Sequence, residues 1–146
     1  MKYMFISENK LKHSLAVARY MQKYAVEHFL DEKLGQELFV LGYLHDIGEE
    51  FTETKEEHNV VGGLLLKEQK YKYWKEVYYH GNPKAEYSSL ALQILNLAEL
   101  CINSDGSFIG IDTKLAMLRE KFGETSVQYI NSLALANKVR GKLPRK

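Results

Sequence analysis

The stretch Phe39-Val40-Leu41-Gly42-Tyr43-Leu44-His45-Asp46-Ile47-Gly48 joins six uncharged residues to a histidine, an aspartate and a glycine that can end a helix. A helix over the first six residues is apolar around most of its circumference, which is typical of a helix inside a core. A carboxylate at the inner end of such a helix is costly unless a cation or several donors meet it. The stretch therefore predicts a central, largely buried helix that delivers His45 and Asp46 to a metal. The alternative is a helix end that has reached water, with His45 favoured by the helix dipole.

Length and composition predict one domain over residues 1–146. Apolar residues make up 45% and charged residues 27% of the chain, as in ordinary globular proteins. The net charge of +1 gives no support for a nucleic-acid partner or a membrane surface. Cys101 is the one cysteine, which excludes an internal disulfide and fits a reducing compartment. Met1-Lys2-Tyr3-Met4-Phe5 lacks a signal-peptide core, and no apolar run reaches the length of a membrane span, so we expect a cytoplasmic protein.

Apolar residues recur at three- and four-residue steps along almost the whole chain, which is a helical period. Ser7, Asp31 and Asp112 are predicted to begin three of the helices, and Gly123 to interrupt the series. No strand is expected. The fold class is therefore all-α, a single-domain bundle of about six to seven helices, with expected ranges 7–29, 31–46, 56–69, 71–79, 88–102, 112–122 and 124–140.

Four histidines come from different predicted helices or from the ends of those helices: His13, His45, His58 and His80. Each alone has a structural explanation, as a core residue or a helix-end residue. An antiparallel bundle, however, can bring all four together. Imidazoles and carboxylates are the usual ligands of catalytic divalent metals, so the joint pattern with Asp46 indicates a metal site. The fifth histidine, His28, is expected at the surface.

The order of His13, then His45-Asp46, then an acidic residue after Leu97-Ala98 resembles the HD-domain superfamily of metal-dependent phosphohydrolases. Two further segments, His58-Asn-Val-Val-Gly-Gly-Leu-Leu-Leu66 and Tyr79-His80-Gly81-Asn82-Pro83, look like the extra histidine segments of many members. The resemblance covers about 12–121. It implies an all-α fold with a metal site at the centre of the bundle.

Two positions depart from the family pattern. The later helix usually presents Ala-Asp, whereas this chain has Ala98-Glu99, a longer oxygen ligand. Asp105 is a fallback ligand that does not match the motif. Many relatives, including cyclic-dinucleotide phosphodiesterases, have a lysine at the position of Glu49, where Glu49-Glu50 instead repels phosphate. Guanosine-tetraphosphate hydrolases of the same superfamily have an acidic pair at this spacing, which makes Glu49 and Glu50 candidate catalytic residues.

The resemblance implies a divalent metal, with Mn, Fe, Zn, Ni and Mg not distinguished, held by His13, His45, Asp46 and Glu99. Such a metal lowers the pKa of bound water and polarises a phosphoryl oxygen, while Asp46 orients or deprotonates the water. His58 and His80 can complete a second site, which gives one or two ions per chain. Candidate phosphate-binding residues flank the matched histidines, each with a solvated charge as its alternative: Lys12, Arg19, Asn82 and Lys84.

The expected activity is metal-dependent hydrolysis of a nucleotide-like phosphate ester or anhydride, by a phosphomonoesterase or a phosphodiesterase. One alternative is a guanosine-tetraphosphate-type pyrophosphohydrolase of the same superfamily. Another is a regulatory module that binds metal or nucleotide without turnover, a possibility that Glu99 raises. A structural helical adaptor is the third, and it predicts no tightly bound metal. The expected partner is a small phosphorylated molecule, and a homo-oligomer is compatible with the sequence.

Overall fold

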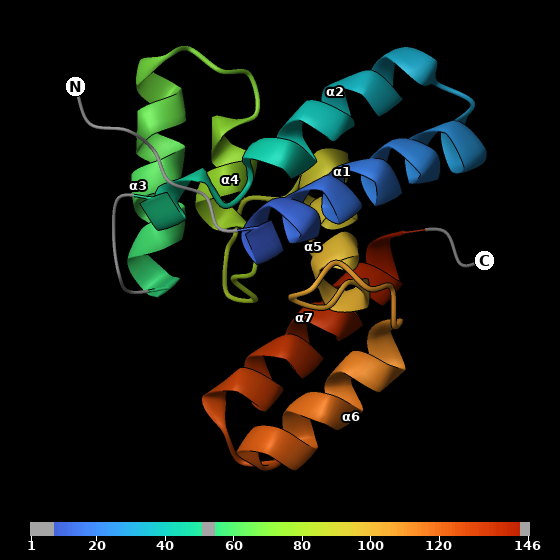
Figure 1. Cartoon of the computed structure of the whole chain (residues 1–146), viewed down its shortest axis with the longest axis vertical. Helices are drawn as coiled ribbons and strands as arrows, with labels where there is room; N and C mark the ends of the chain where they lie inside the picture. The colour runs from blue at the N-terminus through green and yellow to red at the C-terminus, as the bar shows by residue number, and fades with distance from the viewer. Residues whose placement is uncertain (1–7, 51–54, 144–146) are drawn as a thin grey trace.

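The computed structural model describes residues 8–50 and 55–143, with the backbone alone for residues 8, 9, 49, 50, 55 and 56 (Figure 1). These residues form helices and no strand, and their one β-type pairing is an isolated bridge between Ile102 and Phe108. The all-α prediction is confirmed. Ser7, the predicted first cap, lies outside the described residues. The elements are α1 (Glu8–Phe29), α2 (Glu32–Leu44), the 3-10 helix η1 (Ile47–Glu50), α3 (Lys55–Glu68), α4 (Trp74–Tyr79), α5 (Leu90–Cys101), α6 (Ile111–Phe122) and α7 (Val127–Lys142).

Helices α1 and α2 form an antiparallel hairpin whose backbones nearly touch (Figure 1). The turn between them ends at Asp31, whose side chain accepts a hydrogen bond from the Leu34 nitrogen at 2.9 Å and caps α2 as predicted. A Cβ at Gly42 would lie 2.6 Å from the Cα of Ala18, so only glycine permits this approach. The hairpin therefore fixes the end of α2, where His45 lies, beside the first half of α1.

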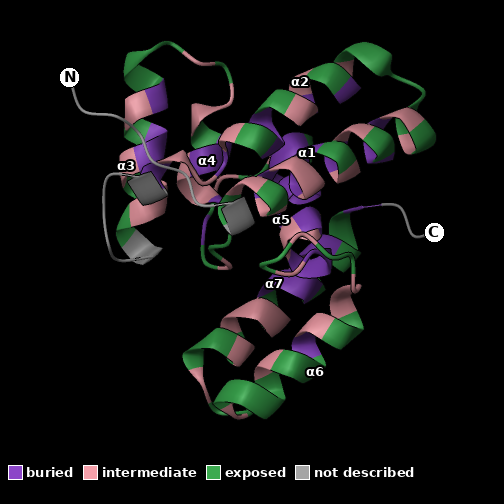
Figure 2. Cartoon of the chain, in the orientation of Figure 1, coloured by how far each residue is buried: buried purple, intermediate pink, exposed green. Residues whose placement is uncertain are grey.

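The most buried helix is α5, which lies between the α1–α2 hairpin and α7 (Figures 1 and 2). Nine of its residues are buried, including the polar Gln93 and Asn96. The prediction that the helix over Phe39–Asp46 would be central and largely buried holds only in part. Leu38, Leu41 and Gly42 are buried, but Val40 and Tyr43 are 46% and 43% exposed. Because α1 covers one side of α2, the opposite side remains open to solvent.

Glycines also set the packing behind η1. A Cβ at Gly48 would lie 1.8 Å from the carbonyl oxygen of His58, and one at Gly62 would lie 2.9 Å from the Gly48 nitrogen. A Cβ at Gly63 would lie 2.6 Å from the Cβ of Tyr78, which shows how tightly α3 approaches α4. The segment that follows Asp46 is therefore held directly against α3.

Helices α6 and α7 form a second hairpin, on the side of α5 away from α2 (Figure 1). Leu135, Ala136 and Val139 are buried, and they join the core around α5. Two predicted details are wrong here. Gly110, with φ +85°, precedes α6, and Asp112 lies in the first turn of that helix; α7 begins after Ser126, which caps it, and not at Glu124.

No helix among the described residues is both long and apolar enough to span a bilayer.

Candidate metal centre

The first residue of the site, His13, lies in α1 and is held by a loop from the far end of α5. Its Nδ1 donates a hydrogen bond to the carbonyl oxygen of Asn103 at 2.9 Å. A carbonyl only accepts, so the proton is on Nδ1 and the Nε2 lone pair of the neutral ring points the other way. This arrangement leaves Nε2 as a metal-ligating atom, as in many metal sites where the second ring nitrogen is bonded to the protein.

His45 ends α2 and has the same tautomer. Its Nδ1 donates to the carbonyl oxygen of Gly42 at 2.5 Å, one turn back along the helix. The side chain is fully buried, and Nε2 has no hydrogen-bond partner. A buried nitrogen without a partner is costly, so a proton or a metal on Nε2 is needed to satisfy it.

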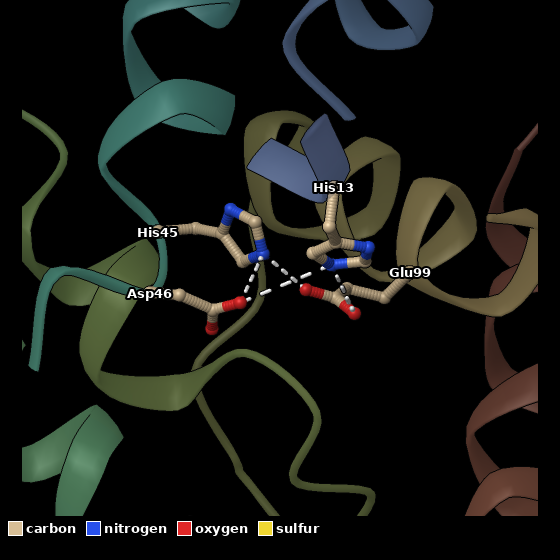
Figure 3. Close-up of side chains that lie close together, drawn as sticks. All are labelled: His13, His45, Asp46 and Glu99. Carbon is tan, nitrogen blue, oxygen red and sulfur yellow. Dashed lines mark ion pairs between the residues drawn. The ribbon is translucent and has the colours of Figure 1, made fainter. Parts of the chain in front are cut away.

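Two carboxylates face these nitrogens (Figure 3). Asp46 Oδ2 lies 3.0 Å from His45 Nε2 and 3.8 Å from His13 Nε2. Glu99, which projects from α5, places Oε1 in close contact with His45 Nε2 and Oε2 at 3.5 Å from His13 Nε2. One ligand atom from each of the four residues lies within 4.8 Å of all the others. The fold thus brings together the four residues predicted to hold the first metal.

The electrostatics of the group are those of a cation site. Burial lowers the pKa of His45, but Asp46 and Glu99 together raise it well above its usual value. The pKa of His13 is likewise raised, since Glu99 outweighs the effect of burial. Burial alone would raise the pKa of Asp46 and of Glu99, yet the neighbouring histidines hold both below their ordinary ranges. Both acids are therefore ionised at neutral pH, and positive charge is favoured between them.

A divalent ion fits this donor set. Two imidazole nitrogens and two carboxylate oxygens suit Zn, Fe and Mn, and the two carboxylates beside the buried Nε2 of His45 favour positive charge there. The side chain of His45 is fully buried, whereas Asp46 and Glu99 are 22% and 24% exposed. The group therefore opens to solvent on its carboxylate side, where water and a substrate can reach it.

His80 lies next to the group. Its Nδ1 donates to the Val77 carbonyl at 2.7 Å, and its Nε2 lies 3.5 Å from Asp46 Oδ1, the oxygen that His13 and His45 do not contact. Its ring lies edge-on to His45 at 5.3 Å between centroids. The fold thus places this predicted ligand beside Asp46.

Sequence reasoning missed the groups that hold these histidines. Asn59 Nδ2 donates to the His80 carbonyl at 2.6 Å, and Asn96 Oδ1 accepts from the Gly81 nitrogen at 2.8 Å. The Asn103 carbonyl holds His13, as described above. A backbone carbonyl has no sequence signal. The only hint for the two asparagines is that Asn59 follows His58, and that Asn96 is polar within an apolar helix.

The remaining predicted ligands lie outside the four-residue group. His58 is half-buried in α3, with its backbone carbonyl against Gly48. The backbones of Glu49 and Glu50 lie in η1, directly after the ligand Asp46, but their side chains lie outside the described residues. Asp105, the fallback ligand, accepts hydrogen bonds from the nitrogen and hydroxyl of Ser107 in an exposed turn.

The predicted phosphate-binding residues are scattered. Lys12 is exposed and adjoins His13 in α1. Asn82 and Lys84 lie in the exposed loop after His80, where the Lys84 nitrogen donates to Asn82 Oδ1 at 2.9 Å. Arg19 instead lines a groove between α1 and the first turns of α2, at the opposite end of α2 from His45. His28 stacks on Tyr24 at 4.0 Å, near the end of α1.

Comparison with known proteins agrees with this geometry. A family model described as HD domain matches residues 11–104, more than half of the chain and the part that contains His13, His45, Asp46 and Glu99. No curated protein and no solved structure gives a significant match. Residues from 105 onward, which include α6 and α7, lie outside the matched range. The chain therefore belongs to the HD-domain superfamily of metal-dependent phosphohydrolases.

Proposed function

We propose that the protein hydrolyses a phosphate ester or anhydride of a nucleotide-like small molecule, with a divalent metal at His13, His45, Asp46 and Glu99. The observation that carries the proposal is the convergence of these four side chains, with the carboxylate side exposed to solvent. When bound, the metal supplies a lowered water pKa and polarisation of a phosphoryl oxygen. A structural metal site would instead be closed on all sides.

Asp46 is the candidate for proton transfer. Its Oδ2 faces the two imidazoles of the metal group, whereas Oδ1 faces His80 Nε2 at 3.5 Å. Oδ1 is thus placed to accept a proton from the attacking water, and His80 can then stabilise the protonated carboxyl. Lys12, Asn82 and Lys84 are the candidates for holding phosphate, because they flank His13 and His80.

The number of metal ions is a separate point. His80 beside Asp46 supports a second ion that shares Asp46, while His58 stays a sequence prediction. His80→Gln and His58→Gln should each remove one of two metal equivalents if both residues are ligands. A metal-to-protein ratio that stays at one under excess Mn²⁺ would decide against the second site.

The activity is tested by metal analysis of the purified protein and a panel of mono-, di- and cyclic nucleotides, with guanosine tetraphosphate included. Asp46→Ala should abolish turnover and leave the helical circular-dichroism spectrum unchanged. Glu120→Ala removes an exposed carboxylate on α6, outside the matched domain, and is the matched control that should keep full activity.

Two other outcomes would each support a different function. Turnover of guanosine tetraphosphate alone would indicate the pyrophosphohydrolase, which the acidic pair Glu49–Glu50 favours. A metal-loaded protein that hydrolyses nothing in the panel would indicate a regulatory module. The observation that favours this second alternative is Glu99, since a longer ligand than the usual aspartate can hold the ion in a geometry unsuited to attack.

A further inference from the structure

A pocket of about 590 Å³ lies on the face of α5 that is turned away from Glu99. Leu97 and Cys101 line it, and at 100° per residue both lie about 200° around the helix from Glu99. None of the four clustered ligands lines this pocket. Its volume falls within the roughly 300–1,000 Å³ of small-molecule sites, so it is large enough for a ligand of its own.

The chemistry of the lining favours an aromatic molecule. Tyr20 and Phe108 stack at 5.7 Å between ring centroids with an interplanar angle of 23°, and both line the pocket. Phe108 is 63% exposed, so this wall is a large apolar ring left mostly in water. A planar ligand ring placed against these two side chains would bury apolar area that is now exposed.

One end of the pocket carries charge. Arg140 donates from Nη2 to Asp112 Oδ1 at 2.6 Å, and both residues line the pocket. The Asp112 side chain is 90% exposed, so the pair contributes little to stability and can be exchanged. An acidic group on the ligand could replace the Asp112 carboxylate as the partner of the Arg140 guanidinium.

A short loop links this pocket to the metal centre. The Asn103 carbonyl accepts from His13 Nδ1 at 2.9 Å and from the Gly106 nitrogen at 3.0 Å, while the Asn103 nitrogen donates to Ser107 at 2.8 Å. Phe108 follows directly and pairs with Ile102. The loop tip lies on α1, because a Cβ at Gly106 would be 3.0 Å from the Lys12 carbonyl oxygen. A tightly bonded turn therefore connects Phe108 to the carbonyl that orients His13.

We propose that this pocket is a second ligand site, for a small planar aromatic molecule with one acidic group, and that its occupancy changes metal binding through the Asn103–Phe108 loop. The site itself stands apart from the proposed hydrolysis. Only the coupling rests on a metal at His13. Because coupling between two sites is reciprocal, the ligand alters metal affinity by the same factor as the metal alters ligand affinity.

The probe for the site is 8-anilinonaphthalene-1-sulfonate, an aromatic anion with a planar naphthalene ring, titrated calorimetrically into chelator-treated protein. Leu97→Trp fills the pocket, and Leu133→Trp makes the same change at another half-buried leucine outside it. We expect one dye equivalent per chain, at least about tenfold weaker binding in Leu97→Trp, and unchanged binding in Leu133→Trp. Arg140→Gln should weaken binding as well. Equal dye affinity in Leu97→Trp and the unmodified protein would place the dye elsewhere and overturn the site.

The coupling is tested by repeating the dye titration with saturating Mn²⁺, and by measuring Mn²⁺ affinity with and without dye. We expect the dissociation constants of the dye and of Mn²⁺ to change by the same factor, about fivefold or more. A dye affinity that Mn²⁺ leaves unchanged overturns the coupling. A protein that binds dye but no Mn²⁺ overturns both the coupling and the proposed metal chemistry, while the site remains. A protein that shows the full coupling but no hydrolysis contradicts the proposed function alone.

Discussion

At the scale of single residues, the extra methylene of Glu99 has a visible use. Its two oxygens are divided between the two imidazoles, Oε1 against His45 and Oε2 toward His13 at 3.5 Å. An aspartate at this position is one methylene shorter, so its two oxygens would not reach as far toward His45 and His13. The residue that departs from the family pattern therefore lies among the other ligands.

Replacing Glu99 separates the roles of its charge and of its length. Glu99→Gln should weaken Mn²⁺ binding by at least about tenfold, about 1.4 kcal/mol, because a neutral amide is a poorer ligand than a carboxylate. Glu99→Asp keeps the charge and should bind Mn²⁺ within about tenfold of the unmodified protein. Calorimetric titration of the chelated variants measures both changes. A larger loss of affinity in Glu99→Asp than in Glu99→Gln would mean that the reach of the side chain, and not its charge, decides binding.

The sequence predicted the four clustered ligands but not how they are oriented. His13, His45 and His80 each donate from Nδ1 to a backbone carbonyl, of Asn103, Gly42 and Val77 respectively. Which carbonyl faces a ring depends on the path of the chain, and it leaves no trace in residue types. The candidate ligands could thus be predicted from the resemblance to the HD-domain superfamily, whereas the tautomers required the fold.

At the scale of helices, glycines control the position of His45 and Asp46. Gly42→Ala would push a Cβ into the Ala18 backbone at 2.6 Å, and Gly48→Ala would push one into the His58 carbonyl at 1.8 Å. Backbone cannot move aside as a side chain can, so each change should destabilise by about 1–3 kcal/mol or more. Each should also weaken Mn²⁺ binding, because His45 and Asp46 lie between the two glycines. Urea unfolding and metal titration measure these losses.

Gly141→Ala provides the matched control. It lies in α7, and a Cβ there would meet nothing within 4 Å. The substitution should therefore leave metal binding unchanged and stabilise by up to about 1 kcal/mol, because alanine loses less backbone freedom on folding. If Gly42→Ala proved as harmless as Gly141→Ala, the close α1–α2 approach could not be what positions His45.

Helix ends were more predictable than helix environments. The bounds of α2 and α5 came out within about two residues, since Asp31 and Ser89 cap them as local chemistry requires. Helix α2 is less buried than its uncharged run predicts, because such a run shows that a helix can be buried and not which neighbours cover it. Val40 and Tyr43 remain half-exposed, while α5 is buried even at Gln93 and Asn96.

At the scale of the whole molecule, the α6–α7 hairpin extends the chain beyond the matched HD domain but shares its core. Leu135 is 5% exposed in that core, whereas Ile130, on the same helix, is 50% exposed. Leu135→Ala should cost about 2–5 kcal/mol and lower the midpoint of one single thermal transition. Ile130→Ala should change stability by no more than about 0.5 kcal/mol. A separate early transition in Leu135→Ala would instead show that the hairpin unfolds on its own.

Metal removal should reverse how the stability of the whole molecule depends on pH. In metal-free protein the pKa of His45 is raised, so protonated His45 stabilises the folded state below pH 6.5. This stabilisation is lost as pH rises through the raised pKa. Asp46 and Glu99 have lowered pKa values in the folded protein, so the stabilisation that their ionised forms provide is present above about pH 4.5. This stabilisation is lost as pH falls through the lowered pKa values. Metal-free protein should therefore be most stable between about pH 4.5 and 6.5 and weaken toward pH 8.

A bound metal requires neutral His13 and His45. The stabilisation of the protein by the metal should therefore grow as pH rises toward 8, because fewer protons compete for Nε2. We thus expect the difference in Tm between Mn²⁺-saturated and chelated protein to widen from pH 6 to pH 8. Scanning calorimetry at both pH values measures it. His45→Gln removes both the titrating imidazole and a metal-binding nitrogen, so the difference in Tm should no longer depend on pH. This variant thereby distinguishes the site from unspecific binding of Mn²⁺ to surface carboxylates. A difference that narrows with rising pH would mean that protons do not compete with Mn²⁺, so the ion would not be bound by the buried imidazoles, and the four side chains would form an ion-pair cluster and not a cation site.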